Sequence, residues 1–231
     1  MTCIVTGAGS GIGRAAATEL GRRGYFRNLV LVGRRRESLE ETSRLLPPEC
    51  RSETLVFDIT RLDAIPAMVA DIHARFGDIR CLLNIAGFAA PQPLLTTTAE
   101  NLLQTYTTNV FAPLILAREC AKHMRRLPGA KIVNVASTAA TSARPGWIGY
   151  ASSKAAVVSL SSTLSEELAE YGIKVYCLSP GRCATALRRL LAPAENPDDI
   201  MQPDVVGSVI ADLVAPGEQY LDGQNIIVRK R

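Results

Sequence analysis

Short apolar runs alternate along the chain with longer amphipathic segments. The short runs are apolar at nearly every position, as expected of β-strands that are covered on both faces. They span residues 3–6, 29–33, 54–58, 79–84, 131–136, 173–179 and 225–229. The longer segments carry apolar residues at helical spacing. They predict helices over residues 11–23, 36–46, 62–76, 99–127 and 150–171.

This alternation predicts the fold class. Strands joined by helical crossovers of this length form a parallel sheet with helices on both faces. We therefore expect an α/β protein: a single domain over residues 1–231 with a doubly wound (Rossmann) parallel sheet of about seven strands. Ligands of such sheets bind in the crevice at the carboxyl ends of the strands.

Composition narrows the class of protein. Hydrophobic residues make up 47% of the 231 residues and charged residues 21%, which excludes a largely disordered chain. The 26 basic and 22 acidic residues give a net charge of +4; because aromatic residues are few and no basic stripe extends beyond residues 34–36, we expect no nucleic-acid partner. The apolar runs are too short to cross a membrane, and the N-terminus lacks the pattern of a signal peptide.

The six cysteines and two histidines offer little for a metal site. The cysteines show no CxxC spacing, and several lie inside apolar segments, where cysteine packs as a small hydrophobe. We predict a reduced, cytoplasmic protein that holds no metal.

The first predicted strand runs into a glycine-rich turn, TGAGSGIG at residues 6–13, which the first predicted helix follows. Glycines permit a close backbone approach to a pyrophosphate, and the helix N-terminus offers free N–H groups. The spacing is TGxxxGxG rather than GxGxxG. A tight turn without a ligand is the alternative, which the position between strand and helix disfavours. The residues predicted to bind a dinucleotide are Thr6, Gly7, Ser10, Gly11, Ile12 and Gly13.

The second predicted strand ends in three arginines, Arg34, Arg35 and Arg36. An NAD-binding unit usually carries a carboxylate here, which holds the ribose 2′-hydroxyl. Guanidinium groups suit a 2′-phosphate instead. We interpret Arg36 as the solvated start of a surface helix, and Arg34 and Arg35 as phosphate ligands. The sequence thus predicts NADP(H) in preference to NAD(H).

Three further residues carry candidate chemistry. Ser137 follows a buried strand at the carboxyl edge of the predicted sheet, and Tyr150 and Lys154 begin the next helix on one face of it. An ammonium beside the phenol should lower the pKa of Tyr150 toward neutral pH, and Ser137 could hold a substrate oxygen beside it. A YxxxK pair also occurs on ordinary helix surfaces, but its place after this strand favours catalysis.

The chain resembles the short-chain dehydrogenase/reductase family over nearly its whole length. The resemblance rests on TGAGSGIG at 6–13, NIAG at 84–87, Ser137 with YASSK at 150–154, and Ser-Pro-Gly at 179–181. It implies a catalytic tetrad in which Tyr150 is the general acid/base and Ser137 orients the substrate oxygen. Lys154 would bind the nicotinamide ribose and tune Tyr150, and Asn109 would hold a proton-relay water at a distortion of the fourth helix.

The resemblance also implies cofactor contacts beyond the glycine turn. Asp58 and Ile59 would lie at the adenine, Asn84 beside the nicotinamide ribose and Thr185 at the carboxamide. Read without the family, Asn84 is no more than a strand-end cap. The other implied cofactor contacts are Ala86, Gly87, Pro180 and Gly181.

Two positions depart from the family pattern. Ile85 replaces the second Asn of the usual NNAG, which removes no reacting group. Cys183 replaces a β-branched residue; we expect it to pack, with an oxidation-sensitive thiol as the alternative.

In this family the substrate specificity is determined mainly by the loop after Thr185 and by the segment before Tyr150. Here residues 186–201 form a short substrate loop. Candidate substrate residues are Trp147, Leu187 and Leu190, with simple packing as the alternative for each. For Arg188 and Arg189 a solvated face is favoured over the recognition of an anionic substrate.

The leading prediction is an NADP(H)-dependent oxidoreductase that interconverts a ketone or aldehyde and an alcohol. One alternative is a 3-oxoacyl-thioester reductase with acyl carrier protein as partner, although Tyr171 stands where such enzymes often carry a basic residue. A second alternative is a non-catalytic NADP-binding sensor or scaffold, a class that tends to lose the Tyr or Lys of the tetrad. Family members usually pair through helices equivalent to 99–127 and 150–171, so we expect a homodimer or homotetramer without a membrane partner. The sequence leaves the substrate itself open.

Overall fold

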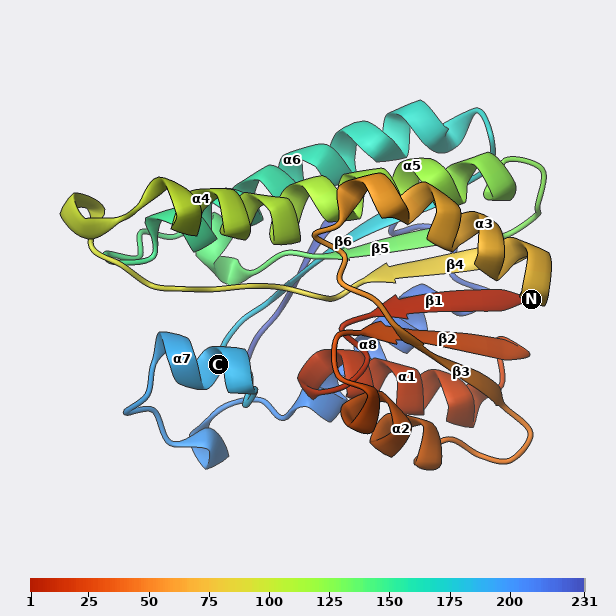
Figure 1. Cartoon of the computed structure of the whole chain (residues 1–231), viewed down its shortest axis with the longest axis horizontal. Helices are drawn as coiled ribbons and strands as arrows, with labels where there is room; N and C mark the ends of the chain where they lie inside the picture. The colour runs from red at the N-terminus through yellow and green to blue at the C-terminus, as the bar shows by residue number, and fades with distance from the viewer. Residues whose placement is uncertain (231) are drawn as a thin grey trace.

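The seven strands of the computed structural model, which describes residues 1–230, lie in one parallel sheet (Figure 1). Their order across the sheet is β3-β2-β1-β4-β5-β6-β7. The strands are β1 (Thr2–Thr6), β2 (Asn28–Gly33), β3 (Arg51–Val56), β4 (Ile79–Asn84), β5 (Lys131–Val135), β6 (Lys174–Pro180) and β7 (Asn225–Val228). The expected doubly wound sheet is confirmed.

Helices cover both faces of this sheet (Figure 1). One face carries α1 (Gly11–Arg23), α2 (Arg36–Arg44) and α8 (Pro203–Leu213), and the other carries α3 (Ile65–Phe76), α5 (Ala112–Met124) and α6 (Ile148–Ala169). The helix α4 (Ala99–Tyr106) leads into α5, and the short α7 (Ala186–Leu191) lies beyond the carboxyl ends of the strands. None of the helices in residues 1–230 is both long and apolar enough to span a bilayer.

Alternate residues of a strand face opposite layers of the core. On β1, Cys3 and Val5 pack in the layer that contains α1 and α8, whereas Ile4 packs in the layer that contains α3 and α5. All three are fully buried, which explains why the run is apolar at every position. In the first layer, a Cβ on Gly207 would lie 2.8 Å from the backbone carbon of Ala15, so glycine lets α8 pack directly on α1.

Three elements differ from the sequence prediction. Strand β3 begins and ends earlier than the apolar run 54–58, because it is an edge strand whose partial exposure accepts Arg51 and Glu53. The predicted helix 99–127 is divided by a π-helical turn over Thr107–Phe111. The helix α8 was not predicted, since Gly207 and the β-branched valines lower its helix propensity, and packing on α1 overrides that preference.

The strand order changes direction between β1 and β4. The chain leaves β1 toward β2 on one side and leaves β4 toward β5 on the other, so the loops that follow these two paired strands diverge at their carboxyl ends. In open parallel sheets this switch point forms a ligand crevice. The predicted site residues come from the loops at this edge.

Candidate active site

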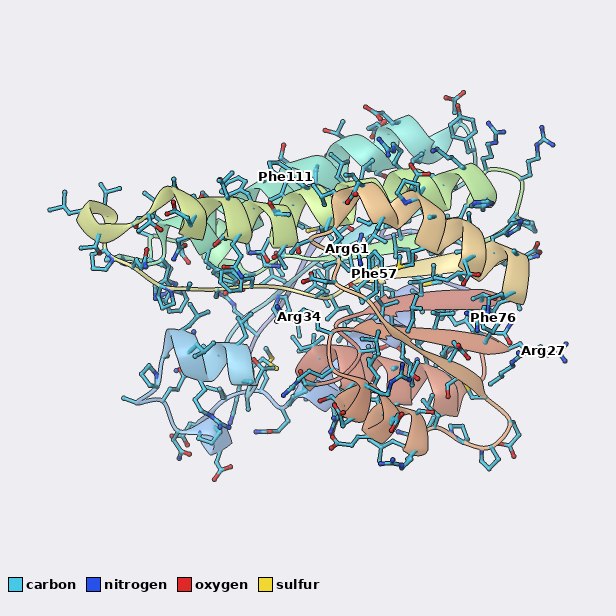
Figure 2. The ribbon with its side chains drawn as sticks, in the orientation of Figure 1. Arg27, Arg34, Phe57, Arg61, Phe76 and Phe111 are labelled. Atoms are coloured by element: carbon cyan, nitrogen blue, oxygen red, sulfur yellow. The ribbon has the colours of Figure 1, made fainter. Side chains whose placement is uncertain are left out.

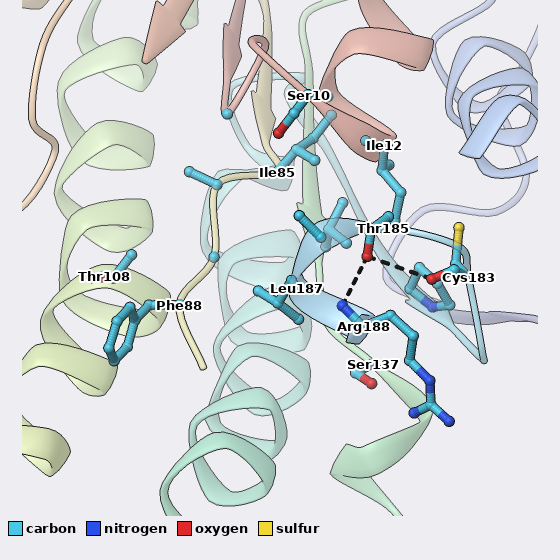
Figure 3. A pocket seen from close by; sticks show the side chains of 18 of the residues that line it. Ser10, Ile12, Ile85, Phe88, Thr108, Ser137, Cys183, Thr185, Leu187 and Arg188 are labelled. Atoms are coloured by element: carbon cyan, nitrogen blue, oxygen red, sulfur yellow. Dashed lines mark hydrogen bonds between the residues drawn. The ribbon is translucent and has the colours of Figure 1, made fainter. Parts of the chain in front are cut away.

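A cavity of about 640 Å³ opens at the carboxyl ends of the strands. Its wall includes the glycine-rich turn after β1, the loops after β2, β3, β4, β5 and β6, the start of α6, and α7 (Figure 3). The glycine-rich turn and Tyr150 therefore line one continuous cavity.

The turn between β1 and α1 has the shape of a diphosphate cradle. Gly7 and Gly11 have φ angles of +69° and +51°, and a Cβ on Gly7 would lie 2.9 Å from the backbone of Ala86. Ser10 caps α1 without a side-chain hydrogen bond, which leaves the first N–H groups of the helix to a ligand. These features, with Ile12 and Gly13 also in the cavity wall, fit the pyrophosphate of a dinucleotide.

Two guanidinium groups lie at the end of the cavity next to this turn. Arg34 and Arg35 line it, and within residues 1–230 neither forms an ion pair with a carboxylate. Arg34 lies at the carboxyl end of β2 and Arg27 at the opposite end of the strand (Figure 2). Arg36 begins α2 and is exposed outside the cavity wall, as expected. The sequence analysis missed Ser38, whose place in the first turn of α2 brings it into the wall.

Most of the other predicted cofactor residues also line the cavity. Asp58 and Ile59 follow β3, and the Asp58 carboxylate accepts hydrogen bonds from the Thr60 backbone and hydroxyl at 3.0 and 2.8 Å. Thr185 lies over the glycine turn, since a Cβ on Gly11 would lie 3.1 Å from its methyl carbon. The remaining predicted residues in the wall are Ala86, Gly87, Pro180 and Gly181.

Thr6 is an exception, because it is buried behind the cavity wall. Its hydroxyl donates to the carbonyl oxygen of Leu83 at 3.1 Å and accepts from the N–H groups of Ile85 and Ala86 at 3.0 and 3.2 Å. The hydroxyl is therefore engaged with backbone groups of β4 and of the loop that follows it. Thr6 joins the ends of β1 and β4.

Asn84 is a second exception. Its amide donates to Asn134 Oδ1 at 2.9 Å and to the Pro113 carbonyl at 3.2 Å, and Asn134 in turn donates to Ser161 at 3.0 Å. Asn84 is buried outside the cavity wall. Through this internal network Asn84 joins the end of β4 to β5 and to the loop before α5.

Ser137 and Tyr150 lie at the other end of the cavity. The Ser137 hydroxyl accepts from the Ala139 N–H at 3.1 Å, which orients the residue after β5. Burial raises the pKa of Tyr150 above its ordinary value, while a hydrogen bond with Ser137 and the charge of Arg188 oppose this shift. Both groups therefore act on the phenol.

Lys154 lies over the ring of the same phenol. Its Nζ lies 5.9 Å from the Tyr150 ring centroid and donates to the Val135 carbonyl at 2.7 Å. Burial lowers the pKa of Lys154 to about 8. The pKa of Tyr150 is raised overall, because the burial of the phenol outweighs the two opposing effects, and the Lys154 ammonium is turned toward the Val135 carbonyl.

Asn109 lies in the π-helical turn between α4 and α5. This turn is the helix distortion that the resemblance implied. The Asn109 amide donates to the Phe88 carbonyl and to Ser153 Oγ, both at 2.9 Å, and its oxygen accepts from the Phe88 N–H at 2.8 Å. A Cβ on Gly87 would lie 3.6 Å from Asn109 Oδ1 and 3.7 Å from Lys154 Nζ, so the two side chains border the same point of the site.

The candidate substrate residues divide into two groups. Trp147 and Leu187 line the cavity, together with Leu191. Leu190 is 65% exposed and lies outside the cavity wall. The spacing explains the difference, because residues 187 and 191 are four apart and share one face of α7.

Arg188 also differs from the prediction of a solvated face. It lines the cavity and donates to both Glu195 carboxylate oxygens, at 2.6 and 2.8 Å (Figure 3 shows the side chain on α7). Arg144, which the sequence analysis did not consider, lines the cavity as well. Its position in the segment before Tyr150 was the available clue. Arg189 is exposed, as expected.

Cys183 lies in the cavity wall but is only 4% exposed and packs in the core layer with α8. Burial raises the pKa of its thiol to about 11, which disfavours the reactive thiolate. The packing interpretation of Cys183 is therefore supported over the oxidation-sensitive one.

The sequence matches one family model, described as short chain dehydrogenase, over residues 1–196. The chain belongs to this short-chain dehydrogenase/reductase family. The glycine turn, Ser137 after β5 and the Tyr150–Lys154 part of α6 line one cavity. The protein is thus an oxidoreductase of a family that binds a nicotinamide cofactor.

Relatives in the family differ in their activities. The gluconate 5-dehydrogenase of Gluconobacter oxydans is 35% identical over 97% of this chain and 91% of its own length. The 3-oxoacyl-acyl-carrier-protein reductase of Haemophilus influenzae is 30% identical over 84% of this chain and 78% of its own. The crystal structure of levodione reductase superposes with a TM-score of 0.89 at 25% identity, covering 99% of this chain and 95% of the other.

Proposed function

We propose that this short-chain dehydrogenase/reductase is an NADP(H)-dependent enzyme that interconverts a ketone or aldehyde and an alcohol. One observation carries the proposal. Ser137, Tyr150 and Lys154 meet at one end of a cavity whose other end holds the glycine turn, Arg34 and Arg35. One cavity thus contains both the proposed phosphate site and the proposed proton donor.

In this proposal, NADP(H) when bound supplies or accepts the hydride. Tyr150 gives its hydroxyl proton to the substrate oxygen during reduction and takes it back during oxidation. Ser137 donates a hydrogen bond to the same oxygen and holds it beside Tyr150. Lys154 binds the nicotinamide ribose, and Asn109 is a positioning residue that holds the Phe88 loop and, through the π-helical turn, a relay water.

The preference for NADP(H) rests on charge. Arg34 and Arg35 face the cavity without a carboxylate partner in the described part of the chain, and Ser38 adds a hydroxyl beside them. A 2′-phosphate would gain charge-assisted hydrogen bonds there. A ribose 2′-hydroxyl would find no carboxylate after β2.

The 3-oxoacyl-thioester reductase is the second candidate, supported by the relative from Haemophilus influenzae. It would require acyl carrier protein to approach the mouth of the cavity. A sensor without turnover is the third, and the presence of both Tyr150 and Lys154 in the cavity wall opposes it.

We further propose that the chain acts as one catalytic and cofactor-binding domain, with 186–201 as its substrate loop, and that it self-associates. Support for self-association comes from α5 and the residues just after α6, where Leu114 is 41% and Tyr171 42% exposed beside a hollow of about 480 Å³. Phe111, which immediately precedes α5 (Figure 2), is 42% exposed. Six free thiols support a reducing compartment such as the cytoplasm.

The function is tested by following NADPH and NADH oxidation with thioesters, diketones, cyclic ketones and steroidal ketones. Tyr150→Phe should lower kcat at least about 100-fold, because the transferable proton is lost, while NADPH still binds. Turnover that survives this substitution would disprove the role of Tyr150. A response to thioesters alone would favour the second candidate.

A further inference from the structure

Two arginines flank the single tryptophan of the chain at the Tyr150 end of the cavity. The guanidinium carbons of Arg144 and Arg188 lie 6.0 and 5.6 Å from the Trp147 ring centroid. Trp147 in turn meets the Tyr150 ring edge-on, with centroids 6.3 Å apart. All four side chains line the cavity, so two cations border the space next to the proposed proton donor.

The two arginines have different partners. Arg188 is held by both oxygens of Glu195, which also lies 3.3 Å from Arg182. Arg144 is exposed and, within residues 1–230, forms no ion pair with a carboxylate. Arg188 is therefore fixed in place, whereas the Arg144 guanidinium is available to a ligand.

Charge in the cavity wall is unevenly balanced. Asp58 is the one acidic side chain among the described residues that line the cavity, and it belongs to the loop after β3, close to the Arg34 end. Arg144 and Arg188 lie beside Trp147, and Glu195, which is not in the cavity wall, pairs with Arg188 and with Arg182 but not with Arg144. A neutral ketone would leave this excess positive charge unused.

The geometry points to a substrate that carries an anionic oxygen group, a carboxylate or a phosphate monoester, which Arg144 binds while Trp147 forms the wall beside it. Guanidinium groups bind such oxygens through paired, charge-assisted hydrogen bonds. Stacking on Trp147 restricts the rotamers of Arg144, so less entropy is lost on binding. The Arg144 guanidinium carbon lies 6.0 Å from the Trp147 ring centroid, which lies 6.3 Å from the Tyr150 ring centroid, so the Trp147 ring lies between the anionic group and the reacting carbonyl. This inference rests on the oxidoreductase function proposed above.

Binding can be measured without turnover, because Trp147 is the only tryptophan and its fluorescence reports on this end of the cavity. Levulinate and its methyl ester, and dihydroxyacetone phosphate and dihydroxyacetone, are titrated into the NADP⁺-loaded protein at constant ionic strength. We expect each anion to bind about 10- to 100-fold more tightly than its neutral partner, the range of a charge-assisted contact. If only levulinate binds more tightly than its neutral partner, the site is a carboxylate site; if only dihydroxyacetone phosphate does, it is a phosphate site.

Arg144→Gln should abolish this preference, and Arg189→Gln, an exposed cation on α7 outside the cavity wall, should keep it. Equal binding of anion and neutral partner by the wild type would overturn the inference. So would a preference that survives Arg144→Gln, or an Arg144→Gln variant that loses only NADP⁺ affinity, since Arg144 would then serve the cofactor. Two results would separate this inference from the proposed NADP(H)-dependent carbonyl chemistry. If NADPH does not bind, or if none of the carbonyl compounds named here is reduced although the anions bind, the proposed carbonyl chemistry fails and the anion site stands.

Discussion

The ammonium of Lys154 donates a 2.7 Å hydrogen bond to the carbonyl oxygen of Val135, the last residue of β5. A helix residue thus anchors itself to the strand that precedes Ser137. The bond satisfies a buried cation but does not remove the cost of burying it, which lowers the pKa of Lys154 to about 8.

Lys154→Met should reveal this cost as a pH dependence of stability. Below pH 8 the lysine is protonated in both the folded and the unfolded state; between pH 8 and 10.5 the unfolded chain binds more protons, so the free energy of unfolding rises with pH. The wild type should therefore gain about 2–3 kcal/mol relative to Lys154→Met between pH 7 and 10.5. Urea unfolding of the cofactor-free protein measures the difference, and the exposed Lys230→Met should show none. A flat difference for Lys154→Met would mean that its ammonium is well hydrated.

Arg188→Gln should shift the pH profile of catalysis. The charge of Arg188 lowers the pKa of Tyr150, so its removal should move the rising limb of kcat/KM for alcohol oxidation to higher pH. Arg188→Lys keeps a charge and should restore most of the midpoint. A midpoint that does not move in Arg188→Gln would show that Arg188 serves only to hold Glu195.

Arg34→Asp should change the choice of cofactor. A carboxylate in place of the guanidinium would repel a 2′-phosphate, so the Kd for NADPH should rise about 10- to 100-fold while that for NADH changes little. Arg36→Asp adds the same charge outside the cavity wall and is the matched control. Equal effects on both cofactors would remove Arg34 from the phosphate site.

Gly207→Ala should destabilise the fold. The added methyl would lie 2.8 and 2.9 Å from backbone atoms of Ala15 and Ala16, which cannot move without separating α8 from α1. We expect a loss of about 1–3 kcal/mol in the free energy of unfolding. Gly217→Ala meets nothing within 4 Å and should be nearly neutral. Equal stability of the two variants would show that α8 can shift.

The sequence predicted the sheet well, because buried parallel strands are apolar on both faces and stand out from their surroundings. It misplaced β3, whose edge position allows Arg51 and Glu53 inside the strand. It missed α8, where the reason for a helix lies in Ala15 and Ala16 of another element rather than in local preference.

The candidate site shows the same division. Residues of the glycine turn and the Tyr150 helix were identified because their spacing along the chain is itself the motif. For Thr6 and Asn84, only the three-dimensional structure shows that the Thr6 hydroxyl bonds to β4 and that the Asn84 amide N–H group bonds to Asn134. Arg144 was not predicted, because its proximity to Trp147 and to the cavity depends on the conformation of a loop.

The Thr6 hydroxyl described above joins the two halves of the sheet at the switch point. Through it, the cradle after β1 and the loop that carries Ala86 and Gly87 form one hydrogen-bonded unit. The conformational entropy of ordering these two loops is therefore lost when the chain folds, not when a dinucleotide arrives. The protein can accordingly bind and release its cofactor in each catalytic cycle without reorganising the backbone that surrounds the phosphates.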